Sequence, residues 1–264
     1  MALIDYDLIS GKLDKVAIAI ARLKEFEPEE GYYLAFSGGK DSIVIKRLAE
    51  MSGVKFDSHY NVTTVDPPEL VGFIKKYHPD VTRHRPEKSL PEKMMDEKFV
   101  PLRQQRWCCR YYKEGGGEGR LVITGIRKAE SVKRSKRKVV ESCWKGGGKR
   151  YLNLIIDWED SDVWDFIKSN NVPYCSLYDE GFHRLGCILC PMHSFALRQI
   201  EVKRWPKIAN SWKRWIIRMY DVHHGEVMRN GKIRFENFNS GEEIFEWWLS
   251  NKSIEDPDQT IMFE

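Results

Sequence analysis

Apolar residues in the first part of the chain follow two different periods. Between residues 7 and 26 they recur at helical spacing, which predicts a helix that ends in the sequence EPEEG. The run from Tyr32 to Phe36 is continuously apolar and predicts a short buried strand. Further strands are predicted at 56–65, 81–85 and 121–125, and further helices at 43–50, 67–77, 160–170, 195–220 and 241–251.

Strands that alternate with helices predict an α/β fold with a Rossmann-like parallel sheet covered on both faces. We divide the chain into an N-terminal helical segment (1–30), a central α/β domain (31–195) and a Trp-rich helical C-terminal extension (196–264). The tail from residue 253 is expected to be loose.

Composition places the chain among globular proteins. It has 264 residues, 42% of them apolar, with a formal net charge of +4 and six cysteines. The mean hydropathy is −0.52, and no apolar run approaches the roughly 18 residues of a membrane-spanning helix. The N-terminal sequence has no basic segment followed by an apolar one, so we expect a cytoplasmic protein without a secretion signal. Six cysteines are too few for a disulfide scaffold.

The hexapeptide SGGKDS, residues 37–42, lies between a predicted strand and a predicted helix. Its two glycines let the backbone approach a ligand, and the N–H groups of the turn and the first helical residues then form an anion site. Ser37 and Ser42 add hydroxyl groups, and Lys40 adds a positive charge. Asp41 is unusual beside an anion unless a divalent cation such as Mg²⁺ bridges it to phosphates. The spacing excludes a Walker A motif.

This hexapeptide resembles the PP-loop of the adenine nucleotide alpha-hydrolase superfamily, whose members cleave ATP, or hold adenylylated sulfate, at the α-phosphate. Three later stretches resemble segments of one branch, the phosphoadenosine phosphosulfate (PAPS) reductase family. They are TGIRKAES at 124–131, LIIDWEDSDVW at 154–164 and PYCSLYDEGFHRLGC at 173–187. The resemblance covers about residues 32–192 and implies a PP-loop nucleotide-binding fold. It adds Gly125 and Arg127 to the loop as nucleotide-binding residues.

Four cysteines form two tight pairs, Cys108–Cys109 and Cys187–Cys190. Four thiolates suit a tetrahedral zinc ion or an iron–sulfur cluster, and buried cysteines without a ligand are the third alternative. The resemblance favours a 4Fe-4S cluster, because adenylylsulfate reductases and the ATP pyrophosphatases of DNA phosphorothioation carry one on such a quartet.

The other two cysteines are treated separately. Cys143 lies among basic and glycine residues, where a thiol can become nucleophilic, whereas Cys175 is expected in the core. The PAPS and adenylylsulfate (APS) reductases of this family use a cysteine in a C-terminal segment, but the last cysteine of this sequence is Cys190. We therefore expect the nucleotide chemistry of the family without its sulfonucleotide reduction.

Charge is unevenly distributed. Residues 127–150 contain ten basic and two acidic residues, and this segment is a solvated surface, a mobile loop over the nucleotide or a contact for nucleic acid. The tryptophans of the C-terminal extension are expected in the core rather than stacked on bases.

Together these features predict an adenylylating ATP pyrophosphatase in which Lys40, Asp41 and Arg127 are catalytic. ATP and Mg²⁺ would bind at the loop, DNA or tRNA would accept sulfur, and a cysteine desulfurase is a candidate donor. One alternative is a PAPS or APS reductase with a non-standard nucleophile, for example Cys143. Another is a non-catalytic nucleic-acid-binding module with a structural zinc.

Overall fold

The computed structural model describes residues 3–7, 11–143 and 147–250. The predicted loose tail from residue 253 lies outside these residues. The chain divides into two compact units. The first, called the sheet unit, comprises Met1–Val62, Asp66–Pro86 and Tyr112–Gly186. The second, called the helical unit, comprises Thr63–Val65, Glu87–Tyr111 and Cys187–Glu264.

The sheet unit contains a six-stranded sheet with the order β5-β4-β3-β6-β8-β7. Its strands are β3 (Tyr32–Ala35), β4 (Phe56–Asn61), β5 (Thr82–His84), β6 (Leu121–Thr124), β7 (Val140–Ser142) and β8 (Arg150–Asn153). All neighbours are parallel except the edge strand β7, which runs antiparallel to β8. The chain moves outward from β3 to β5 on one side and then returns to β6 on the other. The predicted Rossmann-like α/β fold is confirmed, and its topological switch point lies between β3 and β6.

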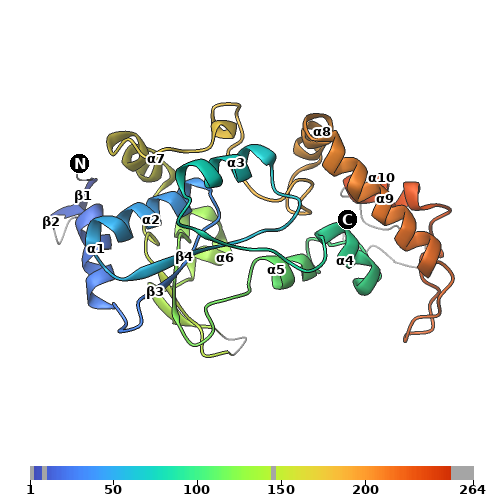
Figure 1. Ribbon diagram of the computed structural model, residues 1–264, viewed down its shortest axis with the longest axis horizontal. Coiled ribbons are helices and arrows are strands. Elements are labelled where there is room, and N and C mark those ends of the chain that lie inside the picture. The colour runs from blue at the N-terminus through green and yellow to red at the C-terminus, as the bar shows by residue number, and fades with distance from the viewer. Residues whose placement is uncertain (1–2, 8–10, 144–146, 251–264) are drawn as a thin grey trace, which may run out of the picture. The chain divides into compact units, whose positions relative to one another are not determined.

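Helices cover one face of this sheet (Figure 1). They are α1 (Lys15–Glu25), α2 (Lys40–Ser52), α3 (Pro68–Tyr77) and α7 (Asp160–Ser169), with shorter turns at η1 (Lys128–Glu130), α6 (Val132–Ser135) and η2 (Ser176–Tyr178). Helix α2 packs against both α1 and α7. The buried hydroxyl of Tyr32 donates a hydrogen bond to the carbonyl of Leu23, which ties β3 to α1 (2.8 Å). The first residue of the central strand therefore points toward these helices.

The opposite face of the sheet is more polar. The rings of Tyr33 and His59, from neighbouring strands, stack with their centroids 4.0 Å apart. Asp57 contacts both His59 and the guanidinium of Arg120. These charges outweigh the effect of burial and hold the pKa of Asp57 below its usual value. On this face the glycine segment around Gly117 lies against Tyr33.

The N-terminal helix is shorter than its periodicity predicts. A hairpin of β1 (Ile4–Asp7) and β2 (Gly11–Asp14) takes up the first half of the predicted range 7–26, and α1 begins only at Lys15. The Asp14 side chain accepts hydrogen bonds from the N–H groups of Val16 and Ala17, so it acts as the helix N-cap. The prediction was wrong because an internal cap competes with helix extension at this position.

The helical unit is built from α4 (Leu90–Glu97), α5 (Trp107–Tyr112), α8 (Phe195–Arg204), α9 (Pro206–His223) and α10 (Gly241–Ser250), although the last residue of α5 falls in the sheet unit. The helix predicted over 195–220 is divided in two at Pro206, because proline fits the first turn of a new helix but not the interior of a continuous one. Trp205, Trp212 and Trp248 are buried, which confirms their assignment to the core. None of the described helices is both long enough and apolar enough to span a bilayer.

Candidate anion site at the switch point

The loop that follows β3 turns directly into α2. Gly39 is the N-cap of α2 and offers no side-chain cap, so the first turn of the helix keeps uncapped N–H groups. Gly38 has a φ of +75°, and an added Cβ there would lie 2.8 Å from methyl carbons of both Leu70 and Ile74 on α3. Only glycine fits this conformation and this close approach, and the loop is therefore held against α3.

Two serines close the loop from inside. The Ser42 hydroxyl donates to the Gly39 carbonyl at 2.8 Å, and the Ser37 hydroxyl lies 3.2 Å from that of Ser42. Among the described residues, the backbone N–H groups of Gly38 and Asp41 have no acceptor. Uncapped N–H groups at the start of a thirteen-residue helix form an anion site, because the helix dipole adds partial positive charge.

Tyr178 completes one side of this site. The N–H of Lys40 donates to the Tyr178 hydroxyl at 2.8 Å. Burial raises the pKa of this tyrosine, and the Lys40 N–H lowers it only partly. Tyr178 therefore stays a neutral phenol. Its oxygen accepts a hydrogen bond from the first turn of α2, as a phosphate oxygen at this helix N-terminus would.

Two buried cations meet on one carboxylate beside the loop. The Lys40 amine lies 3.0 Å from Asp160 Oδ1, and an Arg127 nitrogen donates to the same oxygen at 2.9 Å. Arg127 Nε also donates to Asp41 Oδ1 at 2.6 Å. Arg127 is 3% exposed, whereas the side chain of Asp160 is 60% exposed. The exposed carboxylate thus holds two cations that are themselves withdrawn from solvent.

The neighbouring charges outweigh the effect of burial on the pKa values of Arg127 and Asp160. Burial alone would lower the pKa of Arg127, but Asp41, Glu130 and Asp160 raise it. Burial alone would raise the pKa of Asp160, but Lys40 and Arg127 hold it below its usual value. At neutral pH Arg127 is therefore a cation and Asp160 a carboxylate.

Gly125 allows β6 to approach α2. A Cβ at this position would lie 2.9 Å from the Cβ of Asp41 and 3.1 Å from its backbone carbonyl carbon. The absence of a side chain brings Arg127, two residues later, within reach of the first turn of α2. Gly125 and Arg127 therefore lie beside the predicted loop residues. The loop follows β3 and these two residues follow β6, and the two strands are neighbours in the sheet.

Two residues of this site, Tyr178 and Asp160, were not predicted from the sequence. Both lie in stretches that carry the family resemblance, but single residues there gave no signal of a role in the site. Asp157 and Asp162, the other two aspartates of the LIIDWEDSDVW stretch, are structural. Asp157 accepts two hydrogen bonds from Arg22, and Asp162 pairs with Lys15, so both tie α7 or its preceding turn to α1.

The four cysteines of the predicted quartet all belong to the helical unit. Cys108 contacts Cys109, and this contact, burial and the charges of Cys187 and Cys190 together raise the pKa of Cys108. None of the four forms a disulfide bond, and the other three lie close enough to Cys108 to affect its pKa. Within the described part of the chain, no three or more His, Cys, Asp or Glu side chains are arranged as a metal site. The donor chemistry fits an iron–sulfur cluster or zinc, but the side chains are not in a ligating arrangement.

Cys143 lies at the opposite edge of the sheet from the loop. It follows the last residue of β7, Ser142, which pairs with Arg150 at the beginning of β8. Because β7 is antiparallel, this position is at the amino ends of the parallel strands, whereas the loop is at their carboxyl ends. The Cys143 thiol instead accepts from the Tyr151 hydroxyl at 3.7 Å. Cys175 is buried, as predicted.

Much of the basic segment at 127–150 is neutralised internally. Arg134 and Arg137 pair with glutamates four residues away. Lys149 is 9% exposed and donates to the Glu114 carbonyl at 2.9 Å. The described basic residues of this segment that remain exposed are Lys128, Lys133, Lys136, Lys138 and Arg150.

An open parallel sheet with an anion site at its switch point defines a protein of the nucleotide-binding α/β class. Residues 31–193 match the phosphoadenosine phosphosulfate reductase domain, so the chain belongs to this family. The match covers more than half of the chain and includes the loop, Gly125, Arg127 and all four cysteines of the quartet.

Several relatives are similar in sequence. An uncharacterised protein of Methanocaldococcus jannaschii is 29% identical over 236 residues, which are 83% of this chain and 56% of the relative. The adenosine 5'-phosphosulfate reductase of Neisseria meningitidis serogroup B is 32% identical, over 48% of this chain and 56% of the relative. That of Oceanobacillus iheyensis is 29% identical, over 61% of this chain and 68% of the relative. The match with this chain thus spans about half the length of the first three curated relatives.

A solved structure supports the fold. The phosphoadenylyl-sulfate reductase of Candida auris, crystallised as a phosphate complex, superposes with a TM-score of 0.50 at 18% identity. The superposition covers 66% of this chain and 88% of that structure. At this identity the likeness concerns the arrangement of the strands and helices.

Proposed function

We propose that this chain is an ATP pyrophosphatase that activates an acceptor by adenylylation, in the service of sulfur transfer to nucleic acid. One observation carries the proposal: the N–H groups of Gly38 and Asp41, at the N-terminus of α2, have no acceptor among the described residues, and Lys40 and Arg127 lie beside them at the switch point of the sheet. Backbone donors and two buried cations in this position suit the phosphates of a nucleotide.

Each residue of the site then has a role. The N–H groups of Gly38 and Asp41 hold phosphate oxygens, and the hydroxyls of Ser37 and Ser42, bonded within the loop, keep these N–H groups in position. Gly39 and Gly125 keep the space free of side chains. Lys40 and Arg127 leave Asp160 in part and meet the charge that develops on the α-phosphate. Mg²⁺, when bound with ATP, supplies further neutralisation of phosphate charge.

The reaction is a substitution at phosphorus. An acceptor oxygen forms a bond to the α-phosphorus, the bond from this phosphorus to the bridging oxygen breaks, and pyrophosphate leaves with the electron pair. The terminal persulfide sulfur of a donor, such as a cysteine desulfurase, then displaces AMP from the adenylylated acceptor. A second thiol cleaves the resulting S–S bond, so that the sulfur stays on the acceptor and the donor leaves as a disulfide. DNA and tRNA are the acceptors that fit this chemistry.

The test follows the products of ATP with Mg²⁺, with and without DNA or tRNA. Pyrophosphate and AMP are expected from the wild-type chain. Lys40→Ala and Asp41→Ala are expected to lose turnover at least 100-fold with an unchanged fold, whereas Lys75→Ala, on the exposed face of α3, retains it. Release of ADP and inorganic phosphate, or normal turnover in both loop variants, would contradict the proposal.

Asp160→Asn separates binding from fold. The variant removes the carboxylate charge shared by Lys40 and Arg127 but keeps the shape of the side chain. Nucleotide phosphates then meet two cations with less competition, so a lower KM for ATP is expected. An unchanged or higher KM would mean that these cations do not face the phosphates.

A reductase is the second candidate, because the named relatives include adenosine 5'-phosphosulfate reductases. It requires a thiol that attacks the sulfate sulfur. The position of Cys143 at the opposite sheet edge argues against that residue as the nucleophile. Sulfite release from PAPS or APS with thioredoxin, without pyrophosphate from ATP, would favour the reductase.

We also propose that Cys108, Cys109, Cys187 and Cys190 bind a 4Fe-4S cluster. Their placement in one unit and the contact of Cys108 with Cys109 support this proposal. Anaerobically purified protein is expected to contain about four iron and four acid-labile sulfide per chain. Cys108→Ser loses them, and Cys175→Ser, the buried control, retains them. One zinc per chain would indicate a structural metal, and no metal would indicate unliganded thiols.

A further inference from the structure

Helix α9 carries an excess of positive charge. It contains Lys207, Lys213, Arg214 and Arg218, whereas its one acidic residue, Asp221, follows in the last turn. The opposite face of the helix is core, since Ala209, Trp212, Ile216 and Met219 are buried. An exposed helical face normally mixes both signs of charge, because mixed charges form ion pairs along the helix. The positive charge that gathers between Lys207 and Arg218 of α9 therefore requires an explanation other than helix stability.

The cations of this face are not neutralised by the described parts of the molecule. Lys207, Lys213 and Arg214 form no ion pair with any described residue, although such pairs are frequent elsewhere in the chain. Helix α10 packs against α9 and carries Glu242, Glu243 and Glu246. Glu243 accepts hydrogen bonds from Asn239 instead, and none of the three glutamates pairs with a described α9 residue.

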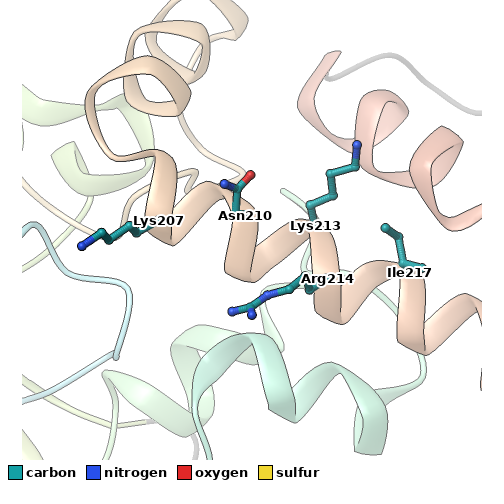
Figure 2. A pocket seen from close by; sticks show the side chains of 5 residues that line it. All are labelled: Lys207, Asn210, Lys213, Arg214 and Ile217. Atoms are coloured by element: carbon teal, nitrogen blue, oxygen red, sulfur yellow. The ribbon is translucent and has the colours of Figure 1, made fainter.

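These side chains line a shallow hollow of about 670 Å³ together with Asn210 and Ile217. Figure 2 shows that the amines of Lys207 and Lys213 and the guanidinium of Arg214 do not point to one spot but spread along the helix. With a rise of 1.5 Å per residue, Lys207 and Arg214 are separated by roughly 10 Å along the axis. Charges spread in this way suit several phosphates of a chain better than one small anion.

We propose that this face of α9 binds the sugar–phosphate backbone of a nucleic acid. The amide of Asn210 can donate to a phosphate or sugar oxygen, and the three cations neutralise successive phosphates. An anionic membrane fits less well, because the only apolar residue that lines the hollow among those described, Ile217, is half-buried. The inference rests on the nucleic-acid acceptor of the proposed function, for which it supplies a holding surface.

The experiment compares two triple variants with equal loss of charge. Lys207→Gln, Lys213→Gln and Arg214→Gln remove the proposed surface, whereas Lys75→Gln, Lys76→Gln and Lys168→Gln remove exposed charges from α3 and α7. Fluorescence anisotropy with a labelled 40-base-pair duplex and a labelled tRNA gives Kd over a series of salt concentrations. Thermal unfolding checks that both variants fold.

The α9 variant is expected to bind at least ten times more weakly than wild type at 100 mM salt. Its salt dependence should fall, since three lost phosphate contacts reduce the slope of log K against log salt by about 2 to 3. The control is expected to change Kd by less than threefold. Equal weakening in both variants, unchanged binding, or binding only to anionic vesicles overturns the inference.

Pyrophosphate release without nucleic acid separates this inference from the proposed function. The α9 variant should keep that basal release, because its substitutions lie outside the loop site. Loss of nucleic-acid binding with normal basal release supports the surface, whatever the acceptor is. Normal nucleic-acid binding by wild type without any pyrophosphate release would contradict the enzyme but leave the surface intact.

Discussion

Gly38→Ala tests whether the loop is held by contact with α3. The substitution has two costs, which the structure separates. The first is the left-handed conformation, with φ of +75°, which costs an alanine about 1 kcal/mol. The second is the contact of the new Cβ with Leu70 and Ile74, both at 2.8 Å. Inserting a methyl group into a packed site costs about 1–3 kcal/mol.

Gly53→Ala is the matched control. Gly53 ends the same helix and has the same φ of +75°, but no atom lies within 4 Å of an added Cβ. It therefore has the first cost and not the second. We expect Gly53→Ala to lower the free energy of unfolding by about 1 kcal/mol and Gly38→Ala by about 2–4 kcal/mol.

Urea denaturation measures the free energy of unfolding of both variants. The same measurement on Leu70→Ala, alone and in the Gly38→Ala background, tests the contact itself. Relief of crowding makes this double variant more stable than the sum of its single variants, by about 1 kcal/mol. Equal destabilisation by Gly38→Ala and Gly53→Ala would refute the reasoning, because only the shared conformational cost would then be present.

Two further predictions concern residues around the loop. Burial, assisted by the charge of Lys46, lowers the pKa of His78 to about 4, so the unfolded chain binds this proton more readily between pH 6.5 and 4. The free energy of unfolding is expected to fall by up to about 3 kcal/mol as the pH drops through that range, and a chemical-denaturation series in His78→Leu should lack this component; an equally steep profile would contradict it. Tyr178→Phe removes the acceptor of the Lys40 N–H and should cost about 1 kcal/mol of stability by thermal unfolding, whereas no change would mean that water replaces the hydroxyl.

The parts of the site that the sequence predicts are local. Ser37 to Ser42 were found because a strand, a glycine turn and a helix follow one another within twenty residues, and each has its own pattern. Tyr178 and Asp160 come from segments more than a hundred residues later, and single residues there carry no periodic signal. Both residues follow β8, which is separated from β3 by β6, and a pattern along the chain does not contain this order of strands.

The fold errors have similar causes. Strands β7 and β8 were not predicted from the sequence. They are short, and their residues lack the alternation of apolar and polar positions that marks a half-buried strand. The helix predicted over 7–26 failed because one capping side chain, Asp14, decides where α1 begins. In both places the periodicity of the sequence is too weak to determine the local structure. The strongly apolar sequences of β3 and β6, in contrast, predict buried strands without ambiguity.

The network around Arg127 also changes the meaning of Asp41. A carboxylate beside an anion site suggests a divalent cation when only the sequence is considered. In the structure Asp41 accepts from Arg127 Nε at 2.6 Å, so its charge is balanced within the protein. Its position in the first turn of α2 is favourable for the helix dipole as well. Asp41 therefore needs no metal ion to balance its charge. The reason to expect Mg²⁺ at this site is the negative charge of the triphosphate.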